Sequence, residues 1–117
     1  MALDSMDIKV KFIKGFADKT RLQILDSIKD KEKTVSQIVE EIKGNQSNIS
    51  QHLACLKGCG IIVGRQEGKF MYYGIRDEQV KTLLNMFDVV LGEVEKQVAD
   101  CDKNDQCLSS EGMNCNV

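Results

Sequence analysis

The sequence of 117 residues predicts a mainly α-helical fold with one small β-hairpin. Two short amphipathic segments flank a turn that contains Gly44, which is the spacing of a helix-turn-helix. A stretch rich in strand-forming residues follows at once, interrupted by polar residues around Gly68. A long amphipathic segment then starts at Asp77. Together these elements predict a winged helix-turn-helix domain over residues 1–100 and a flexible, cysteine-containing tail over residues 101–117.

The first two helices are expected before residue 30. Residues 7–16 carry apolar side chains at mostly helical spacing and form the first predicted helix. Asp18 is placed to cap the second helix, which ends at the polar run DKEK. The residues expected to form the buried stripe of the second helix are Leu22, Ile24, Leu25 and Ile28.

The helix-turn-helix is expected between residues 34 and 59. Thr34 or Ser36 can cap its first helix, which Gly44 closes. The second helix starts at one of three adjacent polar residues, Asn45, Gln46 or Ser47. Its inward positions, spaced at i, i+4 and i+7, are Ile49, Leu53 and Leu56. A hairpin is expected to follow, with strands at Ile61–Val63 and Phe70–Ile75.

The outward face of the second helix suits contact with DNA. Its short hydroxyl and amide side chains match the hydrogen-bonding groups of base edges in a major groove. Lys57 lies near its end, and two basic residues are expected near the wing tip. A solvated helix face of no special meaning is the alternative for the helix alone. The candidate DNA-binding residues are Gln46, Ser47, Asn48, Ser50, Gln51, Lys57, Arg65 and Lys69.

Charge is distributed unevenly along the chain. The formal net charge is −2. Residues 43–76 nevertheless carry five basic side chains and one acidic one, a local charge of 5 − 1 = +4. The tail after Asp100 has one lysine against three acids, or 1 − 3 = −2. A basic face of this size is enough for contact with phosphates when a dimer doubles it.

Five cysteines do not suit a disulfide framework, because the cytosol keeps thiols reduced and an odd number cannot all pair within one chain, so metal binding or redox sensing is favoured instead. Cys55 and Cys59 are one helical turn apart and can reach the same soft ion. Burial as small apolar side chains is the alternative. His52, the single histidine, is expected to pack or to hydrogen-bond and not to bind a metal.

The last helix has more apolar surface than a small domain needs to cover. Its stripe, which includes Val80, Leu84, Val90 and Leu91, predicts a homodimer formed through the first and last helices. The alternative is a helix folded back on its own core. No run of apolar residues is long enough for a membrane span, and the start lacks a secretory pattern, so a cytoplasmic protein is expected.

Two stretches carry a resemblance to a known family: ADKTRLQIL at 17–25 and SNISQHLACLKGCGIIVGRQEGKFMYYGI at 47–75. Over about residues 7–100 the chain resembles the ArsR/SmtB family of dimeric winged-helix metalloregulators. The segment HLACLKGCG, followed by EG in the wing, is similar to the cadmium- and lead-sensing members. The resemblance implies a repressor that binds operator DNA without metal and releases it when cysteines of the helix and the tail bind an ion.

Carried over residue by residue, the resemblance makes Cys55 and Cys59 metal ligands. The third ligand is either Cys101 or Cys107, with the tail supplied by the partner subunit. Three thiolates without imidazole suit Cd(II), Pb(II) or As(III), and also Hg(II). The inducer is then a thiophilic ion, and no organic cofactor is expected.

Two other functions remain open for the same fold. One is a repressor that senses oxidants or persulfides through a helix cysteine and a tail cysteine. The other is a protein-interaction module whose tail buffers metal. An enzyme is not expected, because the chain has one histidine, no catalytic carboxylate pair and no phosphate-binding loop.

Overall fold

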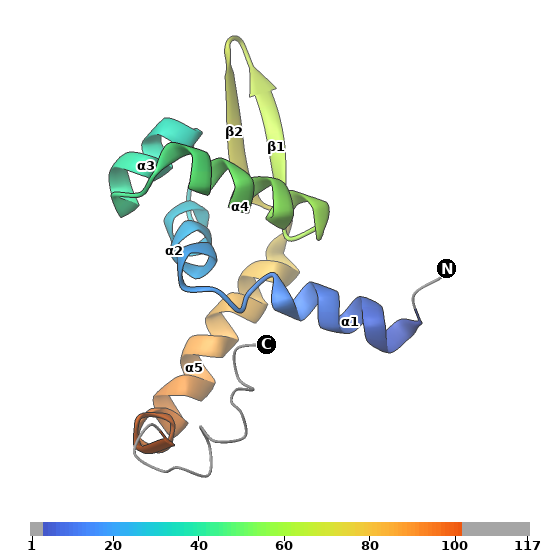
Figure 1. The fold of residues 1–117 in the computed structure, drawn as a ribbon, viewed down its shortest axis with the longest axis vertical. Coiled ribbons are helices and arrows are strands. Elements are labelled where there is room, and N and C mark those ends of the chain that lie inside the picture. Colours follow the sequence, from blue (N-terminus) through green and yellow to red (C-terminus); the bar gives the residue numbers. More distant parts are fainter. Residues whose placement is uncertain (1–3, 102–117) are drawn as a thin grey trace. The chain divides into compact units, whose positions relative to one another are not determined.

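The computed structural model describes residues 4–101 and confirms the predicted fold class. The chain divides into two compact units, Met1–Lys81 and Thr82–Val117. The predicted flexible tail lies almost wholly outside the described residues. In chain order the elements are α1 (Ser5–Lys14), α2 (Lys19–Ile28), α3 (Val35–Ile42), α4 (Gln46–Gly58), β1 (Ile62–Glu67), β2 (Phe70–Ile75) and α5 (Glu78–Cys101) (Figure 1).

Each of the first four helices begins at a polar side chain that accepts a backbone hydrogen bond. Asp18 caps α2 as the sequence predicted, and Thr34 and Asn45 are the members of their predicted sets of alternatives that cap α3 and α4. The first helix starts two residues earlier than predicted, because Asp4 accepts from the backbone N–H of Asp7 at 2.8 Å. Such caps satisfy N–H groups that have no partner within the helix.

The core of the first unit is built from α2, α3, α4 and the hairpin. Leu22, predicted to be buried, is 41% exposed, so that prediction was wrong. At 100° per residue Leu22 lies more than about 100° from the centre of the stripe formed by its three apolar neighbours, and it therefore faces outward. The side chains with less than 2% exposure are Ile24, Leu25, Ile28, Ile38, Ile49, Leu53, Leu56, Ile61 and Ile62.

The turn between α3 and α4 depends on Lys43 and Gly44 in different ways. Lys43, not the predicted Gly44, is the left-handed residue that closes α3, with φ 57° and ψ 46°. Its N–H donates to the carbonyl of Val39. Gly44 is needed for space, since a Cβ there would lie 2.5 Å from Cδ1 of the buried Ile49.

The hairpin is longer than the sequence predicted. Its first strand runs from Ile62 to Glu67, whereas Ile61–Val63 was expected, and the second strand has the predicted bounds. Gly68, with φ 62°, and Lys69 form a two-residue turn between the paired residues Glu67 and Phe70. An exposed hairpin tolerates polar side chains, so the apolar pattern alone underestimated its length.

The loop between α2 and α3 is joined to β2 by one isolated antiparallel β-bridge. Lys33 and Tyr73 exchange backbone hydrogen bonds of 3.0 and 2.8 Å. The Lys33 ammonium also contacts Glu41 of α3, which accepts a 3.2 Å hydrogen bond from Ser27 Oγ of α2. The hydrogen bond from Lys33 lowers the pKa of Glu41. This loop therefore connects α2, α3 and the wing.

The last helix begins after Asp77, which accepts a 3.1 Å hydrogen bond from the backbone N–H of Val80. That bond lowers the pKa of the Asp77 carboxyl. Val80 and Leu84 are buried as predicted. Later apolar residues of the helix, including Val89, Val90 and Leu91, are exposed. No helix among the described residues is both long enough and apolar enough to cross a membrane.

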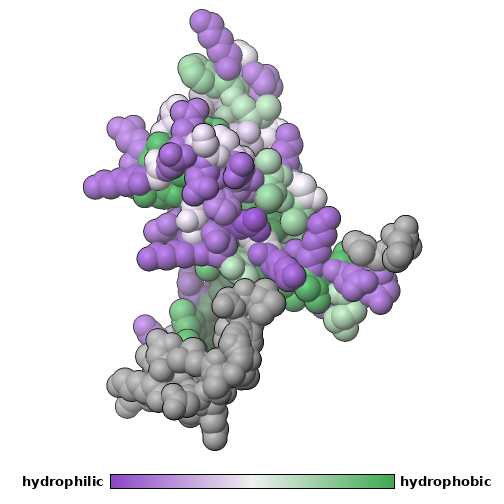
Figure 2. Space-filling view, viewed as in Figure 1, coloured by the Kyte–Doolittle hydropathy of each residue, from purple (hydrophilic) through white to green (hydrophobic). Residues whose placement is uncertain are grey.

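Apolar side chains are exposed on α1 as well. Met6, Ile8 and Ile13 are each more than half exposed, and α1 contributes no buried residue to the core. On the face shown in Figure 2, hydrophilic side chains predominate over α3 and α4, with smaller apolar areas between them. Apolar and polar side chains alternate on α1 in the same view.

Candidate nucleic-acid interface and thiol pair

The exposed face of α4 carries the predicted polar residues. Ile49, Leu53 and Leu56 fix its orientation by packing into the core, and α3 and β1 contact the helix. Apart from the half-buried His52, the remaining side chains on its first two turns are therefore directed outward. The exposed polar side chains are Gln46, Ser47, Asn48, Ser50 and Gln51, all of them candidate DNA-binding residues.

Two of the predicted basic residues lie at the edges of this face. Lys57 is exposed in the last turn of α4, and its Nζ lies 3.5 Å from the position that a Cβ on Gly64 would occupy. Its ammonium thus extends toward the first half of β1. Lys69 is exposed at the turn of the hairpin. Both ammonium groups are exposed and suit contact with phosphates, one from the end of α4 and the other from the turn of the wing.

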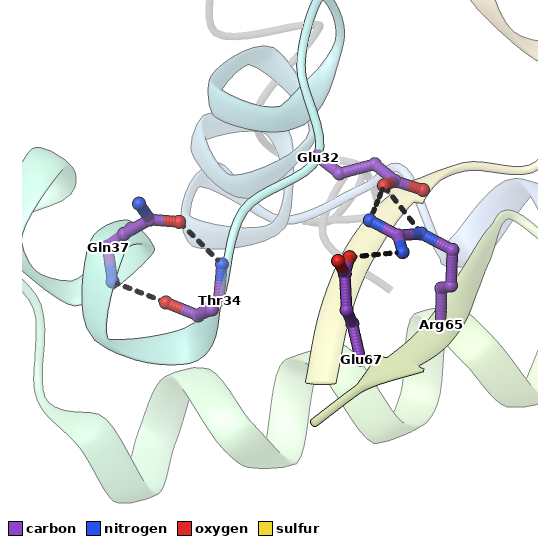
Figure 3. Close-up of polar contacts among 5 residues, drawn as sticks. All are labelled: Glu32, Thr34, Gln37, Arg65 and Glu67. Carbon is purple, nitrogen blue, oxygen red and sulfur yellow. Dashed lines mark hydrogen bonds and ion pairs between the residues drawn. The ribbon is translucent and has the colours of Figure 1, made fainter. Parts of the chain in front are cut away.

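Arg65 lies within β1, opposite Tyr72, and is held by two carboxylates (Figure 3). Its Nε and Nη2 donate to Glu32 Oε1 at 2.9 and 2.7 Å, and its Nη1 donates to Glu67 Oε1 at 2.6 Å. The guanidinium carbon is 5.2 Å from the centre of the Tyr72 ring. The hydrogen bonds that Arg65 donates to Glu32 and, to a smaller extent, to Glu67 raise the pKa of its guanidinium.

Glu32 is a functional candidate that the sequence reasoning missed. It precedes α3 by only a few residues, and Thr34, two residues later, forms the reciprocal cap with Gln37 that starts that helix (Figure 3). Arg65 and Glu32 are 33 residues apart in sequence. No local pattern relates two such residues, because their contact depends on how the hairpin meets the loop.

The two helix thiols lie on one closed turn at the end of α4. The N–H of Cys59 donates to the carbonyl of Cys55 at 3.0 Å, and Cys59 keeps helical backbone angles although the helix ends at Gly58. Cys55 is exposed and Cys59 is half-buried, so neither is the buried apolar side chain of the alternative interpretation. The Cβ of Cys59 is 3.9 Å from the position that a Cβ on Gly15 would occupy.

The thiol pair is an incomplete metal site by itself. Among residues 4–101, no group of three or more His, Cys, Asp or Glu side chains could hold an ion. The side chain of Cys101, and the whole of Cys107, lie outside the described residues. Two thiolates placed one turn apart fit a soft ion, which would need at least one further ligand.

His52 has a structural role, as the sequence predicted. Its Nδ1 accepts a 3.1 Å hydrogen bond from Arg21 Nε, so the ring proton of the neutral form is on Nε2. That nitrogen lies 3.9 Å from Asp18 Oδ2, the same carboxylate that caps α2. His52 thus connects α4 to the start of α2, and this hydrogen bond occupies Nδ1.

A family model described as "Bacterial regulatory protein, arsR family" matches residues 18–63. Among characterised relatives, a probable mercury resistance operon repressor of Streptomyces lividans is 36% identical over 78 residues, 67% of this chain. The chain spans 62% of the length of that relative. The HTH-type transcriptional regulator CmtR of Mycobacterium tuberculosis is 30% identical over 96 residues, 82% of this chain and 75% of CmtR.

Solved structures give the same result for the fold. A homodimeric winged helix-turn-helix DNA-binding domain from Mycobacterium bovis, a possible ArsR-family regulator, superimposes with a TM-score of 0.72. The two sequences are 33% identical, and the match covers 80% of this chain and 92% of that one. Reduced HlyU from Vibrio cholerae is similar too, with a TM-score of 0.64, 30% identity, and coverage of 71% and 87%.

Proposed function

Since the chain belongs to the ArsR family of bacterial regulatory proteins, we propose that it is a cytoplasmic transcriptional repressor whose binding of operator DNA is ended by a thiophilic metal ion. The members of this family named above are transcriptional regulators, so the prediction that the chain is not an enzyme is confirmed. The single observation that carries the proposal is the pair of accessible thiols at the end of the exposed polar helix.

In this proposal α4 enters the major groove and reads base edges. Gln46, Ser47, Asn48, Ser50 and Gln51 supply the contacts to bases, because they share the exposed face of the helix. Lys57 and Lys69 contact phosphates, which carry affinity without sequence information. Arg65 is the third basic candidate and is considered separately below.

The proposed repressor is a homodimer formed through α1 and α5. Exposed apolar side chains on α1, including Met6, Ile8 and Ile13, support this assembly, as does the apolar surface of α5. Removing such side chains from water is favourable by roughly 25 cal/mol per Å² of apolar area, from which the entropic cost of association is subtracted. The similar domain from Mycobacterium bovis is homodimeric. The two copies of α4 in the dimer then bind the two half-sites of an inverted repeat in the operator DNA.

The ion is proposed to be bound by Cys55, Cys59 and one tail cysteine, Cys101 or Cys107. Cys55 and Cys59 fit a soft ion because one is exposed, the other half-buried, and a helical hydrogen bond sets their spacing. Cd(II), Pb(II) and As(III) are the proposed inducers. Hg(II) joins them, because one relative is named a mercury resistance repressor.

Coupling between the ion and DNA is reciprocal. The ion binds at the end of the helix that reads DNA, so a tail linked to Cys55 and Cys59 alters the position of that helix. If the ion weakens DNA binding by a given factor, DNA weakens ion binding by the same factor, typically about 5- to 150-fold. The metal-free dimer is therefore the form with high affinity for the operator.

The proposal is tested by titrating reduced protein with Cd(II), Pb(II), Hg(II) and arsenite. Thiolate-to-metal absorption and operator binding are followed in the same samples. Cys55→Ser is expected to stay on DNA at ion concentrations that release the wild type. Cys115→Ser is the matched control, because Cys115 is a tail thiol outside the proposed ligand set.

The same titration distinguishes the proposed metal sensor from the two alternative functions, a redox sensor and an interaction module. Release of Cys55→Ser at the wild-type ion concentration contradicts the proposed site. Release by an oxidant in chelator-treated protein, without release by any ion, identifies a redox sensor. Absence of sequence-selective, salt-dependent DNA binding identifies an interaction module instead.

A further inference from the structure

The basic residue of the wing that is nearest to the loop before α3 is already paired. Arg65 bonds to Glu32 and Glu67, so this cluster carries a charge of 1 − 2 = −1. We propose that Glu32 competes with DNA phosphates for Arg65 and so limits the affinity of the wing for DNA. This inference rests on the DNA binding of the proposed function and assigns Glu32 a role in setting affinity.

The hydrogen bonds leave the guanidinium few free donors. All three of its nitrogens donate to carboxylates, two of them to the same oxygen of Glu32. A guanidinium has five N–H groups arranged to bind a carboxylate or a phosphate in the same fork-like manner. A phosphate therefore cannot take that face of Arg65 without displacing Glu32 or Glu67.

Of the two carboxylates, Glu32 is the more firmly positioned. Its neighbour Lys33 is hydrogen-bonded to the backbone of Tyr73 on both sides. Its Cγ lies 3.0 Å from where a Cβ on Gly74 would be, so the side chain rests directly on β2. The Glu32 side chain is 39% exposed, against 64% for Glu67 beside the turn. Glu32 therefore loses less conformational entropy than Glu67 when it pairs with Arg65.

Glycine at position 74 makes this arrangement possible. A side chain at that position would occupy the space of Glu32 Cγ. Glu32 can therefore cross β2 and reach Arg65 on the neighbouring strand. The Arg65 guanidinium also lies over the Tyr72 ring, which holds it near the hairpin surface and limits its reach toward a separate phosphate.

The test measures binding to a non-specific DNA duplex as a function of salt, because that binding reports phosphate contacts. Affinity falls as salt rises, and each new phosphate contact makes the slope of log affinity against log salt concentration more negative by about 0.9. Glu32→Gln is expected to bind more tightly than the wild type at low salt. Its affinity should then fall by an additional factor of about 3.5 per new contact as salt rises fourfold.

Two further variants assign the effect to Arg65. Glu40→Gln removes the same charge from the exposed side of α3, and Glu40 belongs to neither ion pair of Arg65. It controls for a general change in charge and should leave the slope unchanged. The double variant Glu32→Gln with Arg65→Gln should have the slope of Arg65→Gln alone. Circular dichroism melting of each protein checks that the fold is retained.

A slope in Glu32→Gln equal to that of the wild type, while both bind DNA, overturns this inference and leaves the proposed function intact. Weaker binding by Glu32→Gln also overturns it, since Glu32 would then support DNA contact and not restrain it. If no protein of the set binds DNA at any salt concentration, the proposed function and this inference both fail.

Discussion

Replacing Gly44 with alanine is expected to destabilise the helix-turn-helix through a single contact. The new Cβ would lie 2.5 Å from Ile49 Cδ1 and 3.3 Å from its Cγ1, well inside normal contact distance. Ile49 is 1% exposed, so its side chain cannot move into solvent. The backbone of the turn or the rotamer of Ile49 must therefore shift.

The magnitude follows from two opposing effects. Overpacking of a core by one methyl group costs about 1–3 kcal/mol. Replacing glycine by alanine also lowers the conformational entropy of the unfolded chain, which stabilises the folded state by about 0.4–1 kcal/mol. The net loss in the free energy of unfolding at Gly44 is therefore up to about 2.6 kcal/mol, with a midpoint of about 1.3 kcal/mol. In a domain of about this size, each kcal/mol lost from the free energy of unfolding lowers the melting temperature by roughly 4–8 °C.

The assay is urea unfolding followed by circular dichroism, at one protein concentration for every variant because association changes apparent stability. Gly58→Ala is the matched control. Gly58 ends α4, and a Cβ there has no atom within 4 Å among the described residues. We expect Gly58→Ala to be neutral or stabilising. A Gly44→Ala protein as stable as Gly58→Ala would refute the steric reasoning.

Three other outcomes are expected. Lys43→Gly should raise the free energy of unfolding by up to about 1 kcal/mol in urea, because glycine avoids the left-handed strain of Lys43; a loss would contradict this. The pKa of the Asp77 carboxyl is lower in the folded protein than its usual value of 3.8. The ionised carboxylate therefore stabilises the fold fully above pH 3.8, and this stabilisation is lost as pH falls through the lower pKa of the folded state. The stability advantage over Asp77→Asn should accordingly shrink below about pH 4 in acid titrations, and an advantage independent of pH would contradict the assignment. Ion affinity at Cys55 and Cys59 should rise with pH in competition titrations, since thiolates must lose protons to bind; a flat profile would point to other ligands.

The parts of the fold that sequence could predict are those decided locally. Asp18 was predicted as a cap, and Thr34 as one of two candidates, from their residue types just before an apolar stripe, and each accepts a bond from the backbone N–H three residues later. The apolar spacing of Ile49, Leu53 and Leu56 placed them in the core correctly. In these cases the residue and its partner lie within about two helical turns of each other.

The parts that sequence missed depend on contacts between distant segments. The pairing of Arg65 with Glu32 joins the wing to the loop before α3, and nothing near either residue indicates it. The reason for a glycine at position 44 was missed for the same cause. The sequence placed Gly44 at the end of a helix, but the approach of the Ile49 side chain, which determines the residue type, depends on how the two helices pack. The ligand set of the thiol pair stays a prediction, because its third member lies in the tail.

The backbone exchange between Lys33 and Tyr73 provides a natural reporter of wing opening. Both amide protons are held in hydrogen bonds of about the usual length, although Lys33 is in a loop between helices. Their exchange with deuterium therefore requires the hairpin to separate from that loop. NMR signals of these two protons would record how often the wing detaches, in the free protein and on DNA alike.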